Sequence, residues 1–153
     1  MLFSETLLVG RSMVGVPTGI RFVEDLRSDR SPLVGIYSGL CAAMTETCFV
    51  MGCDMPFVMP ELVRELLERT NRHDDIVVPL VGGYHEPLCA VYQRSCIPAI
   101  ERALDEDRLK VTSFYPEVAV REIPEEVICR IDPDLLSFTN LNKPKQLELL
   151  AQL

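Results

Sequence analysis

The sequence predicts an α/β domain, a three-layer sandwich with a Rossmann-like, mostly parallel sheet. Three observations lead to this fold class. Short apolar runs typical of strands alternate along the chain with amphipathic helical segments. Residues 47–53 (T-C-F-V-M-G-C) show no polar alternation, which is typical of a parallel strand covered on both faces. The chain has 153 residues, of which 48% are hydrophobic, so we expect a single domain over residues 1–153 with one core.

The first part of the chain predicts two strands and a helix. Residues 6–9 (T-L-L-V) and 20–23 (I-R-F-V) are short apolar runs separated by glycine and proline. Each predicts a strand, and we expect the first to be fully buried. Ser31 and Pro32 provide an N-cap and a first helical residue, which predicts a helix over residues 32–45.

That helix carries two glycines, Gly35 and Gly39, which stand four residues apart and form a bare stripe on one face. Each glycine costs about 1 kcal/mol relative to alanine in a helix interior. Close packing against a neighbouring strand and close approach of a ligand explain the stripe equally well.

The rest of the chain continues the alternation of strands and helices. Pro60 opens an amphipathic helix that follows the buried strand, and Gly82 and Gly83 form a turn between two further strands. The pattern predicts, in order, strands over 76–81 and 87–92, a helix over 95–105 with Ser95 as its cap, a strand over 117–123 and a terminal helix over 143–152.

Composition argues against several classes of function. A formal net charge of −8 disfavours a surface that binds nucleic acid, because phosphate backbones need clustered Lys and Arg. No apolar stretch approaches the roughly 20 residues of a membrane helix, and the amino terminus has no signal-peptide pattern, so we expect a cytoplasmic protein without a membrane partner. The six cysteines form no C-x-x-C pair, and we expect them to be reduced core residues.

Asp54 is the sharpest candidate for chemistry. It directly follows the buried strand and precedes Pro56 and a helix, and in parallel sheets ligands bind beyond the carboxyl ends of the strands. Magnesium is typically held by one or two protein carboxylates together with substrate phosphates. The alternative is an aspartate that bonds the backbone of its own turn, and the spacing favours neither reading.

Three further residues are weaker candidates. Asp25 follows the strand I-R-F-V and could also lie at a carboxyl end, although a solvated loop acid is the simpler interpretation. Asn140 and Asn142 alternate in F-T-N-L-N-K-P and share one face if that stretch is extended. Paired amides can ligate a metal or hold a polar substrate, and they also cap helices.

Four segments, taken together, resemble the molybdenum cofactor guanylyltransferase family of MobA-like nucleotidyltransferases. The order and spacing of the match hold over nearly the whole chain, and the second and fourth segments carry the aspartate and asparagines described above. The segments are S-P-L-V-G-I-Y-S-G-L (31–40), C-D-M-P-F (53–57), G-G-Y-H-E-P-L-C-A-V-Y (82–92) and F-T-N-L-N-K-P-K-Q-L (138–147).

The resemblance implies the fold of nucleotide-diphospho-sugar transferases and a defined reaction. GMP would pass from GTP to molybdopterin-bound molybdenum, giving the guanine dinucleotide cofactor and pyrophosphate, with Mg²⁺ required. It implies that Asp54 is the catalytic, magnesium-binding residue. The residues implied to bind the nucleotide and the molybdenum cofactor are Asp25, Pro32, Leu33, Gly35, Asn140 and Asn142.

The sequence departs from the family at its front. The family begins with a strand and a glycine-rich L-x-G-G-x-S-x-R-M-G-x-D-K loop, and no segment here matches that first β-α unit. We expect the start to be an internal methionine of a longer protein. The alternatives are a truncated, inactive homologue, or a site completed by a partner of the molybdenum pathway or a second copy. A cytidylyl or other nucleotidyl transferase, and a non-catalytic adaptor, are the competing functions.

Overall fold

The computed structural model describes residues 2–13 and 15–141, so the helix predicted over 143–152 lies outside the described residues. The described chain forms two compact units. The first contains the residues up to Cys48 together with Arg72–Ile76 and Tyr92–Val120, and the second contains Phe49–Asn71, Val77–Val91 and the residues from Arg121.

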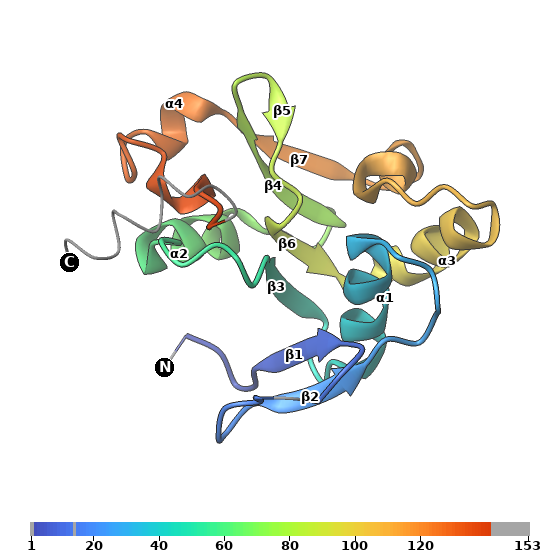
Figure 1. Ribbon diagram of the computed structural model, residues 1–153. Coiled ribbons are helices and arrows are strands. Elements are labelled where there is room, and N and C mark those ends of the chain that lie inside the picture. The colour runs from blue at the N-terminus through green and yellow to red at the C-terminus, as the bar shows by residue number, and fades with distance from the viewer. Residues whose placement is uncertain (1, 14, 142–153) are drawn as a thin grey trace. The chain divides into compact units, whose positions relative to one another are not determined.

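Strands and helices alternate as the sequence predicts (Figure 1). The strands are β1 (Leu7–Gly10), β2 (Arg21–Glu24), β3 (Thr47–Met51), β4 (Ile76–Val81), β5 (Tyr84–His85), β6 (Cys89–Gln93) and β7 (Val120–Ile123). The helices are α1 (Pro32–Ala42), α2 (Pro60–Arg69), α3 (Ile97–Asp105) and α4 (Glu125–Ile128), with short 3-10 helices η1 (Arg94–Cys96), η2 (Val111–Glu117) and η3 (Leu136–Phe138).

In the first unit, β1 and β2 form a parallel pair in which Leu7 lies opposite Arg21 and Gly10 opposite Glu24. Helix α1 packs against both strands and against α3 (Figure 1). The prediction that the first strand is fully buried is wrong, because all four residues of β1 are half-buried. Within the described residues β1 pairs with β2 alone, which leaves its other edge without a neighbouring strand.

Helix α1 begins as predicted and ends three residues early. Ser31 Oγ accepts a hydrogen bond from Leu33 N at 3.0 Å, and Pro32 is the first helical residue. At the other end, Arg21 Nη2 donates to the carbonyl oxygen of Ala42 at 2.7 Å. A cation on a terminal carbonyl stabilises the end of a helix, so Arg21 ties the end of α1 to β2.

The larger sheet has the strand order β3-β6-β4-β5, with β7 also paired to β4, and most of its residues belong to the second unit. Gly82 and Gly83 adopt φ angles of 58° and 82°, which suits a two-residue hairpin turn. The strand directly across that turn is the two-residue β5 and not the predicted 87–92 segment, which forms β6 between β3 and β4. Strand β3 lies at the sheet edge, which explains why it is half-buried instead of covered on both faces.

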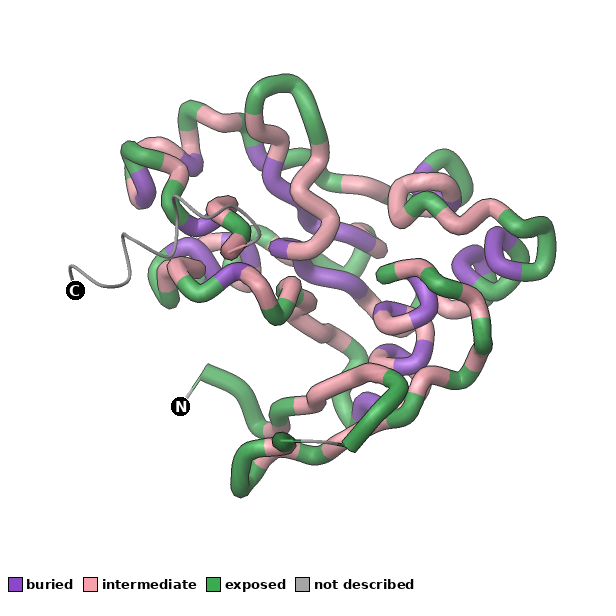
Figure 2. The backbone as a smooth tube through the Cα atoms, viewed as in Figure 1, coloured by how far each residue is buried: buried purple, intermediate pink, exposed green. Residues whose placement is uncertain are grey.

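The core of the second unit joins buried residues of α2 with buried residues of β4, β6 and β7, and Figure 2 marks the buried parts of the chain in purple. Its fully enclosed members are Met55, Leu62, Leu66, Val77, Cys89, Val91, Ile123 and Ile128. Burial raises the pKa of the Cys89 thiol to about 12, so this cysteine is a core residue, as predicted. The same prediction is wrong for Cys53, which is exposed.

The start of α3 also differs from the prediction. Ser95 does not cap the helix, because its hydroxyl donates to the Asp75 carboxylate and the helix begins at Ile97, after the 3-10 helix η1. Across residues 2–13 and 15–141, none of the helices combines the length and the apolar character needed to cross a membrane.

Candidate functional site

Asp54 lies in a tight turn that follows β3. Met55 N donates to the carbonyl oxygen of Gly52 at 3.3 Å, and Gly52 N donates to the carbonyl oxygen of Leu88 at 2.9 Å. The carboxylate folds back over the turn, so that its Oδ1 lies 2.7 Å from the place where a Cβ on Gly52 would stand. The half-buried carboxylate is therefore held in a defined turn at the carboxyl end of a strand, where the sequence places it.

The segment that carries Asn140 meets this turn. Leu141 N donates to the carbonyl oxygen of Asp54 at 2.9 Å, and Met59 N, further along the same loop, donates to Ser137 Oγ at 3.2 Å. These two bonds bring the exposed Asn140 beside the Asp54 turn, although the two residues are far apart in the sequence. Asn142 lies outside the described residues.

A second carboxyl group, Glu86, belongs to the same neighbourhood and was missed by sequence reasoning. It lies two residues before Leu88, whose carbonyl is bonded to Gly52. Burial raises the pKa of the Glu86 carboxyl above its ordinary value. The signal available was its place in the E-P-L-C-A-V-Y segment, directly before a proline.

Asp25 lies in the first unit, at the carboxyl end of β2. Its backbone N donates to the carbonyl oxygen of Gly10 at 2.9 Å, and its side chain is only 15% exposed. One carboxylate oxygen, Oδ2, lies 3.8 Å from Arg11 Nε, whereas Oδ1 is buried without a hydrogen-bond partner among the described residues. Buried acceptors are rarely left in this state, so Oδ1 is suited to accept a donor from a ligand.

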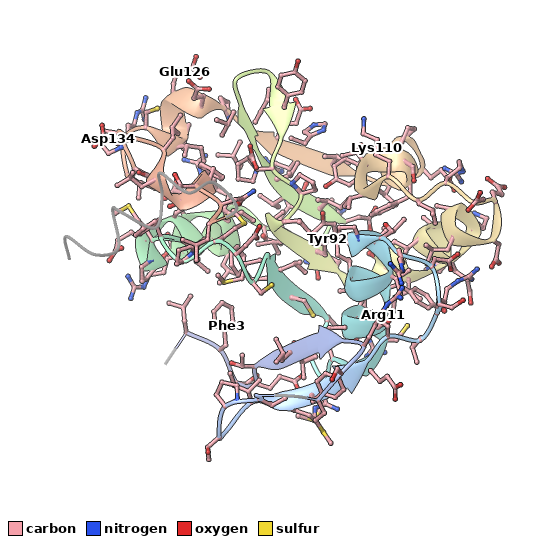
Figure 3. All side chains as sticks on the ribbon, viewed as in Figure 1. Phe3, Arg11, Tyr92, Lys110, Glu126 and Asp134 are labelled. Carbon is pink, nitrogen blue, oxygen red and sulfur yellow. The ribbon has the colours of Figure 1, made fainter. Side chains whose placement is uncertain are left out.

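Around Asp25 lies an open hollow of about 320 Å³ with two arginines on its wall. Arg11 Nη2 donates to the carbonyl oxygens of Ser28 at 2.9 Å and Asp29 at 2.7 Å, which holds it next to the end of β1 (Figure 3). The lining residues are Arg11, Glu24, Asp25, Leu26, Arg27 and Ser28. Sequence reasoning missed Arg11 and Arg27, and the available signal for Arg11 was its position directly after a strand.

The two glycines of α1 serve different purposes. A Cβ on Gly39 would stand 3.3 Å from Val9 Cγ2, so this glycine allows α1 to pack closely on β1. A Cβ on Gly35 would meet nothing within 4 Å, which leaves this position open to an approaching ligand. Pro32 is exposed and Gly35 is half-buried, whereas Leu33 has no exposed surface, so Leu33 supports this turn of the helix from inside and does not itself offer surface to a ligand.

The candidate residues thus fall into two groups. Asp54 and Asn140 come together in the second unit, whereas Asp25, Pro32, Leu33 and Gly35 belong to the first. In the part of the chain that the structure describes, no three His, Cys, Asp or Glu side chains are grouped to hold a metal. A single carboxylate still fits Mg²⁺, which commonly takes its remaining ligands from substrate phosphates and water.

Comparison with known proteins identifies a family and several proteins that are similar to this chain in sequence. Residues 2–118 match the model of the MobA-like NTP transferase domain. The chain is 39% identical over 147 residues to the probable molybdenum cofactor guanylyltransferase of Pelotomaculum thermopropionicum, covering 95% of this chain and 71% of that protein. It is 40% identical over 124 residues to the molybdenum cofactor guanylyltransferase of Desulfosudis oleivorans, covering 81% of this chain but only 61% of that protein.

Solved structures agree with the fold. Molybdopterin-guanine dinucleotide biosynthesis protein A from Archaeoglobus fulgidus superposes with a TM-score of 0.76 at 30% identity, covering 87% of this chain and 69% of that one. The 2-C-methyl-D-erythritol 4-phosphate cytidylyltransferase from Thermus thermophilus has a TM-score of 0.69 at 18% identity, covering 98% and 83% of the two chains, and shows likeness of fold alone. The predicted α/β nucleotidyltransferase fold and the family resemblance are both confirmed.

Proposed function

Because the chain belongs to the family of MobA-like NTP transferase domains, we propose that it acts in molybdenum cofactor biosynthesis as a guanylyltransferase. GMP passes from GTP to molybdopterin-bound molybdenum, and pyrophosphate leaves. The observation that carries this proposal is the bond from Leu141 N to the Asp54 carbonyl. It joins the C-D-M-P-F and F-T-N-L-N segments, the two parts of the sequence that carry the aspartate and the asparagines of the family resemblance.

Asp54 would hold the metal ion of this reaction. The family is one of nucleotidyltransferases, which typically use a divalent metal, and we take that metal to be Mg²⁺. Bound Mg²⁺ neutralises the charge that develops on the phosphates during transfer. Asp54 supplies one carboxylate from a turn fixed by backbone hydrogen bonds, and the triphosphate supplies further oxygen ligands.

Asp25 would recognise the guanine nucleotide. Its buried Oδ1 is an acceptor that needs a donor, and an ionised carboxylate forms strong, directional hydrogen bonds. Guanine carries an amino donor, N2, on an edge where adenine has none. Pro32 and Gly35 lie on the helix that packs against the strand preceding Asp25, and we assign them, with the buried Leu33 between them, to the nucleotide side.

Asn140 and Asn142 would hold the pterin and phosphate groups of the acceptor. Asn140 is exposed and follows a segment bonded to the Asp54 loop, so its amide is available to a polar ligand at the metal. An amide offers both a donor and an acceptor, which suits a pterin ring. Asn142 lies outside the described residues, and we assign it the same role because the family resemblance implies it.

Calorimetric titration with GTP and, separately, CTP in the presence of Mg²⁺ tests the proposal. We expect magnesium-dependent binding of GTP in preference to CTP, and a loss of at least about tenfold in the Asp54→Ala variant, because a charged ligand is removed. The matched control is Asp134→Ala, which removes an exposed aspartate from the same unit.

The other outcomes separate the competing functions. Tighter binding of CTP would replace the proposal with a cytidylyl transferase. Binding of GTP that Asp54→Ala leaves unchanged would remove Asp54 from its role. No binding of either nucleotide would contradict the proposed activity for this chain and favour a non-catalytic adaptor.

A further inference from the structure

We infer that Asp132 is a positioning residue, which fixes the loop of Asp54 and the segment of Asn140 relative to each other. The inference concerns the geometry of the second unit, and only its consequence for ligands rests on the proposed function. Asp132 lies far from Asp54 in the sequence, and it acts through the hydrogen bonds of the segment that follows it.

Asp132 is 1% exposed and is the only charged residue among those classed as buried in the described chain. Both of its carboxylate oxygens accept backbone hydrogen bonds, Oδ1 from Leu136 N at 3.0 Å and Oδ2 from Ser137 N at 2.7 Å. A carboxylate can be buried only where such bonds replace its hydration. Asp132 is therefore bound firmly to the start of the 3-10 helix η3.

Residues 132–138 form a compact hook on the core of the second unit. Leu135 has a φ of 53°, a conformation that is unfavourable for a leucine. Its backbone N donates to the Asp132 carbonyl at 3.1 Å, and its side chain packs with that of Phe138 against the hydrophobic core. The hook needs these contacts to hold an unfavourable backbone, and Asp132 provides three of its hydrogen bonds.

The hook and the residues that follow it contact both ends of the loop between β3 and α2. Ser137, whose N is bonded to Asp132, presents its Oγ to Met59 N at the start of α2. Three residues after η3, Leu141 N bonds to the Asp54 carbonyl at the start of the loop. Asn140 lies between these two contacts, so a change in the position of the hook moves Asn140 relative to the Asp54 turn, which keeps its own bonds to Gly52 and Leu88.

Backbone hydrogen exchange of the full chain distinguishes positioning from a local cap. The variants are Asp132→Ala, which removes both acceptors, and Asp132→Asn, which keeps one. The control is Asp134→Ala, because Asp134 lies in the same hook and is exposed (Figure 3). A purely local cap accelerates exchange at Leu136 and Ser137 only.

A positioning role for Asp132 predicts faster exchange outside the hook as well. In Asp132→Ala, exchange at Met59 and Leu141 should also become at least about tenfold faster, because a bond to a charged group is lost from the hook. Asp132→Asn should give an intermediate value, and amides of β6 in the core should not change. Unchanged exchange at Met59 and Leu141, or acceleration that includes β6 equally, would overturn the inference.

A kinetic measurement connects the geometry to ligands. With GTP and molybdopterin-bound molybdenum as substrates, Asp132→Asn should raise KM for the molybdopterin substrate about as much as Asn140→Ala does, and leave KM for GTP unchanged. The double variant should be no worse than Asn140→Ala alone, since both act through one side chain.

The exchange measurement and the kinetic measurement can fail independently of each other. If the wild-type chain shows no transfer while the exchange result is positive, the proposed function fails and the positioning role stands. If transfer occurs but Asp132→Asn changes both KM values or neither, the positioning of Asn140 by Asp132 is wrong.

Discussion

Asp25 and Asp54 both follow a strand, yet the two carboxylates are supported in opposite ways. Asp54 lies in a turn whose backbone is held by three hydrogen bonds. Met55 N donates to the carbonyl oxygen of Gly52, Gly52 N donates to that of Leu88, and Leu141 N donates to that of Asp54. Asp25 has a buried oxygen with no partner among the described residues. The first arrangement fixes a backbone so that the side chain can bind, and the second keeps a side chain incompletely bonded. Substitutions should therefore affect stability differently at the two positions.

The largest effect is expected for Asp54→Asn. Removing the charge while keeping the shape should lower magnesium-dependent affinity for GTP by about 2 kcal/mol, or about thirtyfold. The reason is that charged groups form stronger hydrogen bonds and bind metal ions more strongly than neutral groups do. Unfolding free energy, measured in urea, should change by less than about 1 kcal/mol, because the turn is held by backbone bonds. A large loss of stability with unchanged affinity would reverse our account of this turn.

Asp25→Ala should lower the affinity for GTP without lowering the stability of the protein. We expect affinity for GTP to fall about tenfold, and the free energy of unfolding to stay constant or rise by up to about 1 kcal/mol, because an unsatisfied buried acceptor is removed. Arg11 Nε lies 3.8 Å from Asp25 Oδ2, and at that distance a half-exposed arginine contributes little to stability. Parallel urea titration and calorimetry measure both quantities, and a clear loss of stability would show that Oδ1 is satisfied in the folded protein.

The glycine pair of α1 sharpens the comparison with a smaller effect. Gly35→Ala should stabilise the free protein by about 1 kcal/mol through helix propensity, since no atom lies within 4 Å of the added Cβ. Weaker GTP binding in the same variant would show that the nucleotide approaches this position. Gly39→Ala is the matched control, and its 3.3 Å contact with Val9 should cancel the gain in stability. Equal stabilisation by both would contradict the packing role of Gly39.

The smallest effect concerns Glu86. Burial raises the pKa of its carboxyl above the ordinary value of 4.5, so folding favours the protonated form. Well below pH 4.5 the group is neutral in both states, and its penalty on folding develops as the pH rises from the unfolded-state pKa of 4.5 to the raised pKa of the folded state. The unfolding free energy of Glu86→Gln, relative to wild type, should therefore increase between pH 4 and pH 7. Urea titrations at the two values test this, and a constant difference would place Glu86 in water.

Sequence reasoning found the elements well because their signals are local. The Ser31 cap, Pro60 and the Gly82-Gly83 turn act within a few residues, and α1, α2 and the hairpin turn begin where they indicate. The predictions of strand burial and of strand pairing were less accurate. The apolar runs of β1 and β3 give no information about which strand lies at an edge, and the two-residue β5 is too short to produce an alternating pattern.

The candidate site residues show the same contrast between local signals, which can be read from the sequence, and contacts between distant residues, which cannot. Asp54 and Asp25 are recognisable because each directly follows a strand. The family resemblance implied a role for Asn140, but no residue pattern predicts that its segment meets the Asp54 turn, since that contact is a bond from Leu141 between distant parts of the chain. Arg11, Arg27 and Asp132 carry no motif at all. Their importance follows from which carbonyls and amides they meet, and only the folded chain determines those contacts.

The bond between Leu141 and Asp54 also has a consequence for synthesis on the ribosome. The chain is made from its amino terminus at about 5 to 20 residues per second, so the Asp54 turn emerges well before the segment that bonds to it. Contacts between distant residues also form late, because they close a long loop. We expect a nascent chain to acquire its cores first and a fixed Asp54 turn only when residue 141 has left the ribosome, which delays metal binding until that segment has docked.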